Sequence, residues 1–415
     1  MAKIIPFKGL RPKKELAEQV ATLPYDVVSV AEAREFKKSP YNFYHVTRSE
    51  IDMPEAVDVH SMQVYEKAKE NLDAMIGNDI MAQDSHPCYY IYELVMDGRS
   101  QTGLVCGSSV DDYNNGIVKK HEFTRPEKEQ DRINHIATTG AQTGIVFLAY
   151  NDCNSVQQII DSWKKNHQPV NDFTAPDGIR HIFWVVDEEA SVAAITKDFA
   201  SDVPCTYIAD GHHRAASAAK VCQQMRESNY TAEGNEPFNY FVTCIFPASQ
   251  LQIMDYNRVA KDLNGRTADE FIKALSGDFD ISNIGGTAFK PTHLHEFGMY
   301  LGGCWYKLEA KMGTYSSDPI GILDVTILQQ NVLDKLLDIK DPRVDKRIDF
   351  VGGIRGMAAL QIRVDSNEAA VAFSLYPVTI KQLFDIADSG NVMPPKSTWF
   401  EPKLRDGLVV YMINP

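Results

Sequence analysis

One junction near the middle of the chain, Asp210-Gly211-His212-His213-Arg214, most constrains how these 415 residues can fold and what they can bind. An apolar run, 205–209, precedes the junction. Small apolar residues follow it at the i, i+3, i+4, i+7 spacing of one buried helix face: Ala215, Ala218, Ala219 and Cys222. The pattern predicts a strand, a tight turn at Gly211 and a helix. Because the N–H groups and the dipole at a helix N-terminus attract anions, we expect a phosphate site here.

The same five residues allow other interpretations. Asp210 could be a plain N-cap, the histidines satisfied core groups, and Arg214 half of a salt bridge. A metal site is a further alternative. Adjacent helical histidines diverge by about 100° and chelate poorly, but Asp210 could still hold Mg²⁺ through water. We favour phosphate, because open α/β sheets bind ligands at the carboxyl ends of their strands.

The charge balance and the cysteines exclude several classes of protein. The chain has 42 basic and 56 acidic residues, a net charge of −14, so nucleic acid and membrane surfaces are not expected partners. Its 7 cysteines contain no CxxC pair, which argues against a disulfide framework and a zinc ribbon. The sequence has no signal-like or membrane-spanning apolar run, so we expect a cytoplasmic protein and attach no meaning to the sequon at 229–231.

Strand and helix patterns alternate between about 140 and 250, which favours a mixed or parallel sheet there. Before them, segments 89–96 and 103–110 are expected to form a hairpin with its turn near Asp97-Gly98. The hairpin favours an α+β (mixed α/β) class for the whole chain. The segment 42–48 reads as a short strand, and Thr379 should cap a helix that ends before Gly390. We divide the chain into an α/β region, 1–250, and a C-terminal α+β region, 251–415.

A second polar cluster surrounds His121 and Glu122. The segment 121–125 begins like HExxH, but Arg125 replaces the second histidine and excludes a zincin. Basic residues accompany the pair: Lys119, Lys120, Arg125 and Arg132. A carboxylate among cations stays ionised, which suits a general base or a magnesium ligand. The alternative is an ordinary solvated helix start.

Lys396, Ser397 and Thr398 carry the last residue types of a P-loop without its glycines, so the backbone cradle cannot form. The segment is either a structural turn or a loop that contacts a phosphate or an adenine ring. GxSxG, HRD and DFG motifs are absent, which argues against classical hydrolases and protein kinases.

Over nearly its full length the chain resembles the domain-of-unknown-function family 1015. The resemblance lies in separated motifs: 23–27, 42–48, 120–124, Asp131-Arg132, 209–214, Asn257-Arg258 and 393–400. The segment 210–214 is also similar to the phosphate-binding box of the ParB/sulfiredoxin superfamily. Free-serine kinases of that superfamily carry the same pentapeptide, use it on nucleotide phosphates and use a glutamate as base. The resemblance implies a ParB/sulfiredoxin-like nucleotide-binding core with additional α+β elements.

The implied activity is that of a small-molecule kinase, which transfers a phosphoryl group from ATP or ADP to free L-serine or a similar hydroxy compound. Phosphoryl transfer needs positive charge, a divalent cation and a base rather than covalent help. The phosphates would contact Gly211, His212, His213, Arg214, Lys396, Ser397 and Thr398. The catalytic candidates are Glu122 as base, Asp210 as Mg²⁺ ligand and His212. The acceptor site would contain His121, Asp26 and, for the carboxylate, Arg132 or Arg48.

Two alternatives from other classes remain open: a nucleotide-binding, ParB-like regulatory protein without metabolic chemistry, and a nucleotide phosphatase that uses water as acceptor. The ParB role on DNA fits poorly, because the chain is acidic and has no evident helix-turn-helix. The sequence does not fix the acceptor, the nucleotide or the oligomeric state, and a homodimer is compatible with it.

Overall fold

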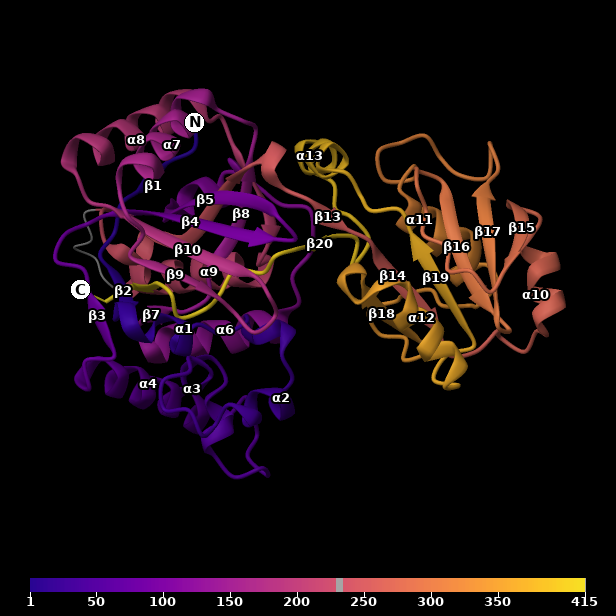
Figure 1. The fold of residues 1–415 in the computed structure, drawn as a ribbon, viewed down its shortest axis with the longest axis horizontal. Coiled ribbons are helices and arrows are strands. Elements are labelled where there is room, and N and C mark those ends of the chain that lie inside the picture. The colour runs from indigo at the N-terminus through magenta and orange to yellow at the C-terminus, as the bar shows by residue number, and fades with distance from the viewer. Residues whose placement is uncertain (229–233, 415) are drawn as a thin grey trace. The chain divides into compact units, whose positions relative to one another are not determined.

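The computed structural model describes residues 1–228 and 234–414, so the sequon at 229–231 lies outside the described residues. The chain forms two compact units (Figure 1). Unit 1 comprises residues 1–251 and 402–415, and unit 2 comprises residues 252–401. This division differs from the one drawn on the sequence in one respect, because the last residues belong to unit 1.

Unit 1 is built on a mixed sheet, as the alternating sequence pattern predicts. Its hydrogen-bonded order is β6 (Val118–Lys119), β11 (Thr206–Asp210), β8 (Val146–Tyr150), β12 (Tyr240–Pro247), β5 (Arg99–Ser109), β4 (Tyr89–Met96), β10 (Arg180–Val186) and β9 (Asn171–Thr174), with β1 (Ile4–Ile5) also pairing with β5. The β6–β11 and β8–β12 pairs are parallel and the others antiparallel. The mixed α/β class is therefore confirmed.

The predicted hairpin is present. Strands β4 and β5 pair from Tyr90–Val105 to Met96–Arg99. Asp97 and Gly98 both have positive φ, 52° and 77°, as a two-residue type I′ turn requires. Strand β4 has the expected bounds, whereas β5 begins at Arg99 rather than at 103 because pairing continues to the turn itself.

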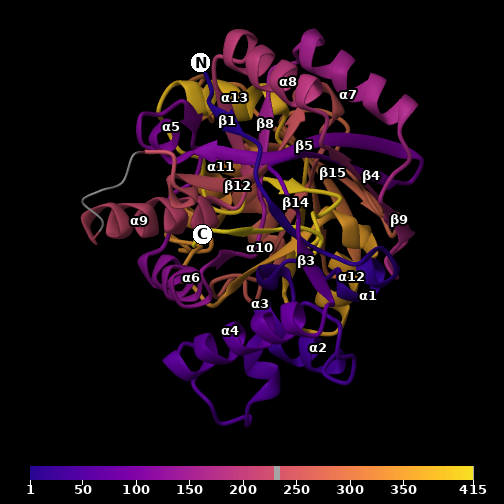
Figure 2. The same cartoon turned by 90° about the vertical axis from the view of Figure 1, so that its left-hand side faces the viewer.

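Helices cover this sheet and form a separate layer beside it. They are α1 (Ala17–Val20), α2 (Val30–Glu35), α3 (Tyr44–Thr47), α4 (Met62–Gly77), α5 (Val110–Asn114), α6 (Pro126–Thr139), α7 (Asn154–Asn166), α8 (Glu189–Asp202) and α9 (His212–Ser228). Helix α6 packs against both α4 and α9. Within unit 1, α2, α3 and α4 lie together at the end opposite α7 and α8 (Figure 2). Among the described residues, no helix combines the length and apolar character needed to span a membrane.

The strand expected at 42–48 is wrong, because this segment forms the short helix α3. The side chain of Asn42 accepts a hydrogen bond from the Tyr44 N–H (3.1 Å) and donates to the Phe36 and Ser39 carbonyls. These bonds start a helical turn at Asn42. Val46 is then buried in a core cluster that includes Leu72 of α4, so tertiary packing overrides the β-branched and aromatic pattern.

A small sheet brings the C-terminal segment back to unit 1. Its order is β3 (Met81–Gln83), β2 (Gly9–Pro12), β21 (Val410–Met412) and β7 (Ala141–Gln142). Strand β21 pairs antiparallel with both β2 and β7. This pairing carries residues 402–409 past the end of β11.

Unit 2 is centred on an antiparallel sheet. Its order is β15 (Phe279–Gly285), β17 (Cys304–Ala310), β16 (Glu296–Leu301), β19 (Val371–Leu375), β14 (Tyr256–Ala260) and β18 (Ile348–Gly352), and β13 (Ile253–Met254) pairs separately with β20 (Trp399–Phe400). The helices are α10 (Ala268–Leu275), α11 (Asp324–Leu328), which continues as a π-helix (Gln329–Asp334), α12 (Gly356–Asp365) and α13 (Ile380–Asp388). The helix expected after Thr379 is confirmed, with a capping box at Thr379 and positive φ at Gly390.

Candidate functional site

The central junction folds as a strand, a turn and a helix. Strand β11 ends at Asp210, Gly211 has φ +99°, and α9 begins at His212. A Cβ at position 211 would lie 3.0 Å from the Arg214 Nε. The positive φ favours glycine here, and a Cβ would in addition crowd the buried Arg214 side chain.

The structure brings the His121-Glu122 pair to this junction. Because β6 pairs in parallel with β11, the chain after β6 passes beside the start of α9. The His121 backbone N–H donates to the His212 Nε2 at 3.3 Å, and the Glu122 Oε2 lies 3.9 Å from the His212 Nδ1. The proximity that the kinase hypothesis assumed for Glu122 is therefore present.

Both histidines of the junction are held in one tautomer. The Nε2 of His212 accepts from the His121 backbone, and the Nε2 of His213 accepts from the Arg125 backbone at 3.0 Å. Burial lowers the pKa of both rings, that of His212 well below its ordinary value, so the rings are neutral and carry their hydrogen on Nδ1. Each ring therefore offers one N–H donor at the N-terminus of α9.

Arg214 is buried behind the junction and joins its acidic groups. Its Nη2 lies 3.5 Å from the Asp210 Oδ1 and 3.9 Å from the Asp26 Oδ2, while Nη1 donates to the Ile145 carbonyl. Burial opposes its charge, but Asp26 and Asp210 hold its pKa above the ordinary value. Among the described residues, its Nε has no hydrogen-bond partner. Arg214 thus anchors two carboxylates, and its contact with phosphate stays a prediction.

Lys403 is a functional candidate that the sequence reasoning missed. Its Nζ lies 3.1 Å from the Asp210 Oδ2. Burial alone would raise the pKa of Asp210, but Lys403 and Arg214 together hold that pKa well below its usual range. No motif near Lys403 in the sequence indicates this role, because Lys403 reaches Asp210 only through the pairing of β21 with β2 and β7.

Asp406 was missed for the same reason. Its carboxyl group is 2 % exposed, and its Oδ2 has no hydrogen-bond partner among the described residues. Burial raises the pKa of Asp406 to about 7, against the opposing charge of Arg214. The Asp406 backbone is fixed by two hydrogen bonds with Thr22 (2.9 and 3.1 Å).

A cavity of about 690 Å³ lies beside the junction, between the α2–α4 layer and the start of α6. It contains three of the predicted acceptor residues, Asp26, Arg48 and Arg132. Arg132 lies over the Tyr25 ring (3.9 Å from Cζ to the centroid) and pairs with Asp131 at 2.7 Å. Because Asp26 also lies 3.9 Å from Arg214, the cavity reaches the junction through Asp26.

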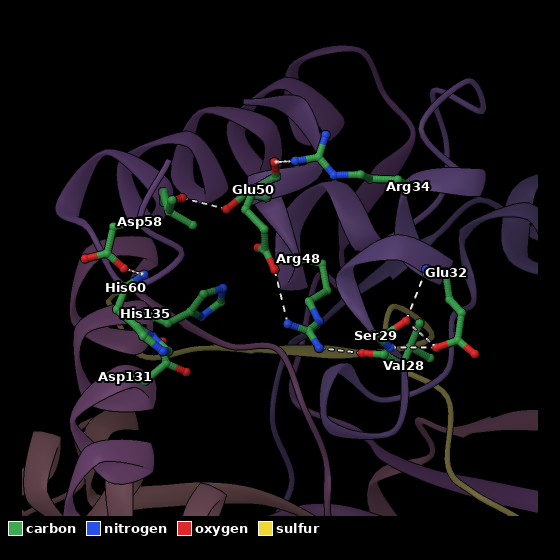
Figure 3. A network of polar contacts seen from close by, with 12 residues as sticks. Val28, Ser29, Glu32, Arg34, Arg48, Glu50, Asp58, His60, Asp131 and His135 are labelled. Atoms are coloured by element: carbon green, nitrogen blue, oxygen red, sulfur yellow. Dashed lines mark hydrogen bonds and ion pairs between the residues drawn. The ribbon is translucent and has the colours of Figure 1, made fainter. Parts of the chain in front are cut away.

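Figure 3 shows the Arg48 side of this cavity. The Arg48 Nη1 donates to the Glu50 Oε1 at 3.1 Å and Nη2 donates to the Val28 carbonyl. Its Nε is buried and has no hydrogen-bond partner in the described part of the chain. His121, the fourth predicted acceptor residue, is not among the residues that line the cavity, and burial lowers the pKa of its ring to about 4.

Lys396, Ser397 and Thr398 belong to unit 2. Lys396 has φ +60°, and its carbonyl accepts a hydrogen bond from the Arg258 Nη2 at 2.9 Å. The Ser397 hydroxyl donates to the Pro394 carbonyl at 2.6 Å, which stabilises a turn. A nucleotide-binding role for the three residues stays a prediction.

The residues at the junction fit a magnesium ion only through Asp210. Within the described ranges, the one His/Cys/Asp/Glu group close enough to chelate a metal alone is in unit 2 and comprises His293, Glu296 and Glu309. Mg²⁺ is commonly held by one or two carboxylates together with substrate phosphates and water. A single carboxylate from Asp210 is sufficient for that mode.

The chain matches the model of the family described as "Protein of unknown function (DUF1015)" over residues 4–326, and it belongs to that family. Similar solved structures include a conserved hypothetical protein from Pyrococcus furiosus (13% identity, TM-score 0.35, 73% of this chain and 93% of that chain). A free serine kinase variant in complex with AMP is 12% identical, with a TM-score of 0.36 over 72% of this chain and 87% of that chain. SbnI with a C-terminal truncation from Staphylococcus aureus is 10% identical, with a TM-score of 0.35 over 74% of this chain and 86% of that chain. Such distant likenesses carry no functional argument. No curated protein matches the chain.

Proposed function

We propose that this DUF1015 protein is a small-molecule kinase that transfers a phosphoryl group from ATP or ADP to the hydroxyl of free L-serine or a similar hydroxy acid. One observation carries the proposal: the Glu122 carboxylate lies 3.9 Å from His212, at the start of α9, and an arginine-containing cavity opens beside the same junction. The groups that we propose as base, anion site and acceptor pocket therefore lie close together, and their proximity supports phosphoryl transfer.

The start of α9 would hold the nucleotide phosphates. The helix dipole and the Nδ1–H donors of His212 and His213 favour an anion there, and Gly211 lets its backbone approach closely. Both rings are neutral donors rather than bases. In the proposal the single Nδ1–H of His212 donates to a phosphate oxygen, and Glu122 accepts the proton of the acceptor hydroxyl.

The cavity would hold the acceptor. Arg48 and Arg132 supply planar guanidinium groups that suit the carboxylate of an amino acid or hydroxy acid. Each arginine also contacts a carboxylate of the protein, so the acceptor carboxylate would share the guanidinium with Glu50 or Asp131. The buried Arg48 Nε is a donor that such a ligand would satisfy.

In the proposed step the acceptor oxygen attacks the terminal phosphorus while its proton passes to a Glu122 carboxylate oxygen. The bond between that phosphorus and the bridging oxygen breaks, so the products are the phosphorylated acceptor and ADP from ATP, or AMP from ADP. Mg²⁺ held by Asp210 would neutralise phosphate charge. Lys403, whose Nζ lies 3.1 Å from the Asp210 Oδ2, keeps Asp210 ionised.

Phosphorus NMR of the full chain with Mg²⁺, L-serine and either ATP or ADP tests this proposal. The expected result is an O-phosphoserine signal that Glu122→Gln abolishes without weakening nucleotide binding. The matched control is Glu189→Gln, which removes an exposed carboxylate from α8. Inorganic phosphate as the only product would instead indicate a nucleotide phosphatase. Nucleotide binding without turnover of either donor, tested also with other small hydroxy acids, would refute the kinase and favour a regulatory protein.

A further inference from the structure

Unit 2 contains a buried cation that lacks an acidic partner. Among the described residues three arginines are buried: Arg214, Arg258 and Arg405. Arg214 lies near Asp26 and Asp210, and Arg405 pairs with Asp177. Arg258, which is 3 % exposed, makes no ion pair with a carboxylate in the part of the chain that the structure describes. Burying an unneutralised charge is costly, so this exception calls for an explanation.

Among the residues that the structure describes, backbone carbonyls and aromatic rings surround the Arg258 guanidinium. It donates to the carbonyls of Tyr256 and Lys396, and its Cζ lies 5.2 Å from the Phe350 ring centroid. Burial lowers the pKa of Arg258 to about 10, and Tyr256 rather than a carboxylate of the described residues opposes that effect. Asp255, the nearest acidic residue in the sequence, directly precedes β14 and pairs instead with Lys290 at 2.9 Å.

A second cation, the Lys396 ammonium, lies near the same aromatic ring as Arg258. Lys396, whose carbonyl accepts from Arg258, has φ +60°, a left-handed conformation that residues other than glycine rarely adopt. The Lys396 Nζ lies 5.7 Å from the Tyr256 ring centroid, and the Arg258 Cζ lies 5.9 Å from the same ring. The Lys396 side chain is exposed, so an anion in solution can reach its ammonium.

We propose that Arg258 and Lys396 form an anion-binding site in unit 2 for a phosphate group, with Tyr256 as its aromatic wall. A phosphate oxygen would supply the counter-charge that Arg258 lacks, and the Lys396 ammonium would contact a second oxygen. The strained backbone at Lys396 is then part of the site, because it directs this lysine toward Tyr256. The site is independent of the proposed kinase reaction and does not rest on it.

Titration calorimetry of the full chain with inorganic pyrophosphate tests the site. Wild type should bind at unit 2, and Lys396→Gln should weaken that binding by about tenfold, the loss expected for one charge-assisted contact. Lys396→Arg should restore it. Lys346→Gln, which removes an exposed lysine elsewhere in unit 2, should have no effect.

Arg258→Lys, which keeps the charge but loses the planar donor pair, should weaken the same binding. Adenosine, which has no phosphate, should not compete. The proposal is overturned if Lys396→Gln and Lys346→Gln bind pyrophosphate equally, or if adenosine competes as well as pyrophosphate does. Because Lys396→Gln and Lys346→Gln share an unchanged α9 junction, any pyrophosphate bound there is equal in both, and the difference between them reports on the unit 2 site alone.

Discussion

Replacing Asp406 with asparagine should stabilise unit 1 in alkaline solution and have little effect in acid. The buried carboxyl keeps its proton in the folded state up to a pKa of about 7, whereas in the unfolded chain it ionises near 3.8. Between these pH values the folded state binds more protons than the unfolded state, so stability falls as pH rises. At roughly 1.36 kcal/mol per pKa unit, the free energy of unfolding should fall by about 4 kcal/mol across that window.

Asparagine is neutral at every pH and removes this loss. For a folding unit of this size, about 4 kcal/mol corresponds to roughly 8 °C in the unfolding midpoint. We expect the Asp406→Asn variant to melt higher than wild type by up to that amount at about pH 8.5. The difference should shrink to nearly zero at about pH 4.

The assay is thermal unfolding followed by circular dichroism at several pH values. Asp187→Asn, which neutralises an exposed carboxylate of unit 1, serves as the control and should leave the pH profile unchanged. If wild type and Asp406→Asn show parallel pH profiles, Asp406 is ionised at neutral pH and the reasoning from its burial is refuted.

Two further substitutions probe the junction directly. Gly211→Ala should lower the free energy of unfolding by about 1–3 kcal/mol, because position 211 has positive φ and a Cβ there would lie 3.0 Å from Arg214. Gly178→Ala, which is also at positive φ but in open space, should lower it by less. Equal melting temperatures of the two variants would contradict this reasoning. Lys403→Gln frees the Asp210 oxygen that Mg²⁺ would use, so the gain in ADP affinity on adding Mg²⁺ should rise by about tenfold. Calorimetry with and without Mg²⁺ measures that gain, and an unchanged ratio would show that Asp210 does not hold the ion.

Local sequence signals were sufficient to predict the strand, turn and helix of the 210–214 junction. An apolar strand, a glycine and a helix with one face of small residues are set by neighbouring residues, and β11, Gly211 and α9 follow that pattern. The Asp97-Gly98 turn and the Thr379 cap were predictable for the same reason, because their signals lie within a few residues. The strand prediction for segment 42–48 was wrong because the hydrogen bonds of Asn42 and packing in the core, rather than strand propensity, determine its conformation.

The assembly of the candidate site depends on strand pairing that no local pattern encodes. Glu122 reaches His212 because β6 adds in parallel to β11. Lys403 and Asp406 reach the junction because β21 inserts between β2 and β7. Sequence separation therefore hid the groups that set the charge of Asp210 and Arg214, although the residue types at the junction itself were evident.

The order of residues along the chain also determines when the candidate site is completed during synthesis. The ribosome makes all of residues 252–401 before it makes Lys403 and Asp406. At about 5–20 residues per second, that interval lasts roughly 8–30 s. Until it ends, β2 and β7 lack their shared neighbour, and Asp210 lacks the lysine beside it. During this interval the nascent chain contains the 210–214 junction without the lysine that neutralises Asp210, and the site is complete only after β21 has been added.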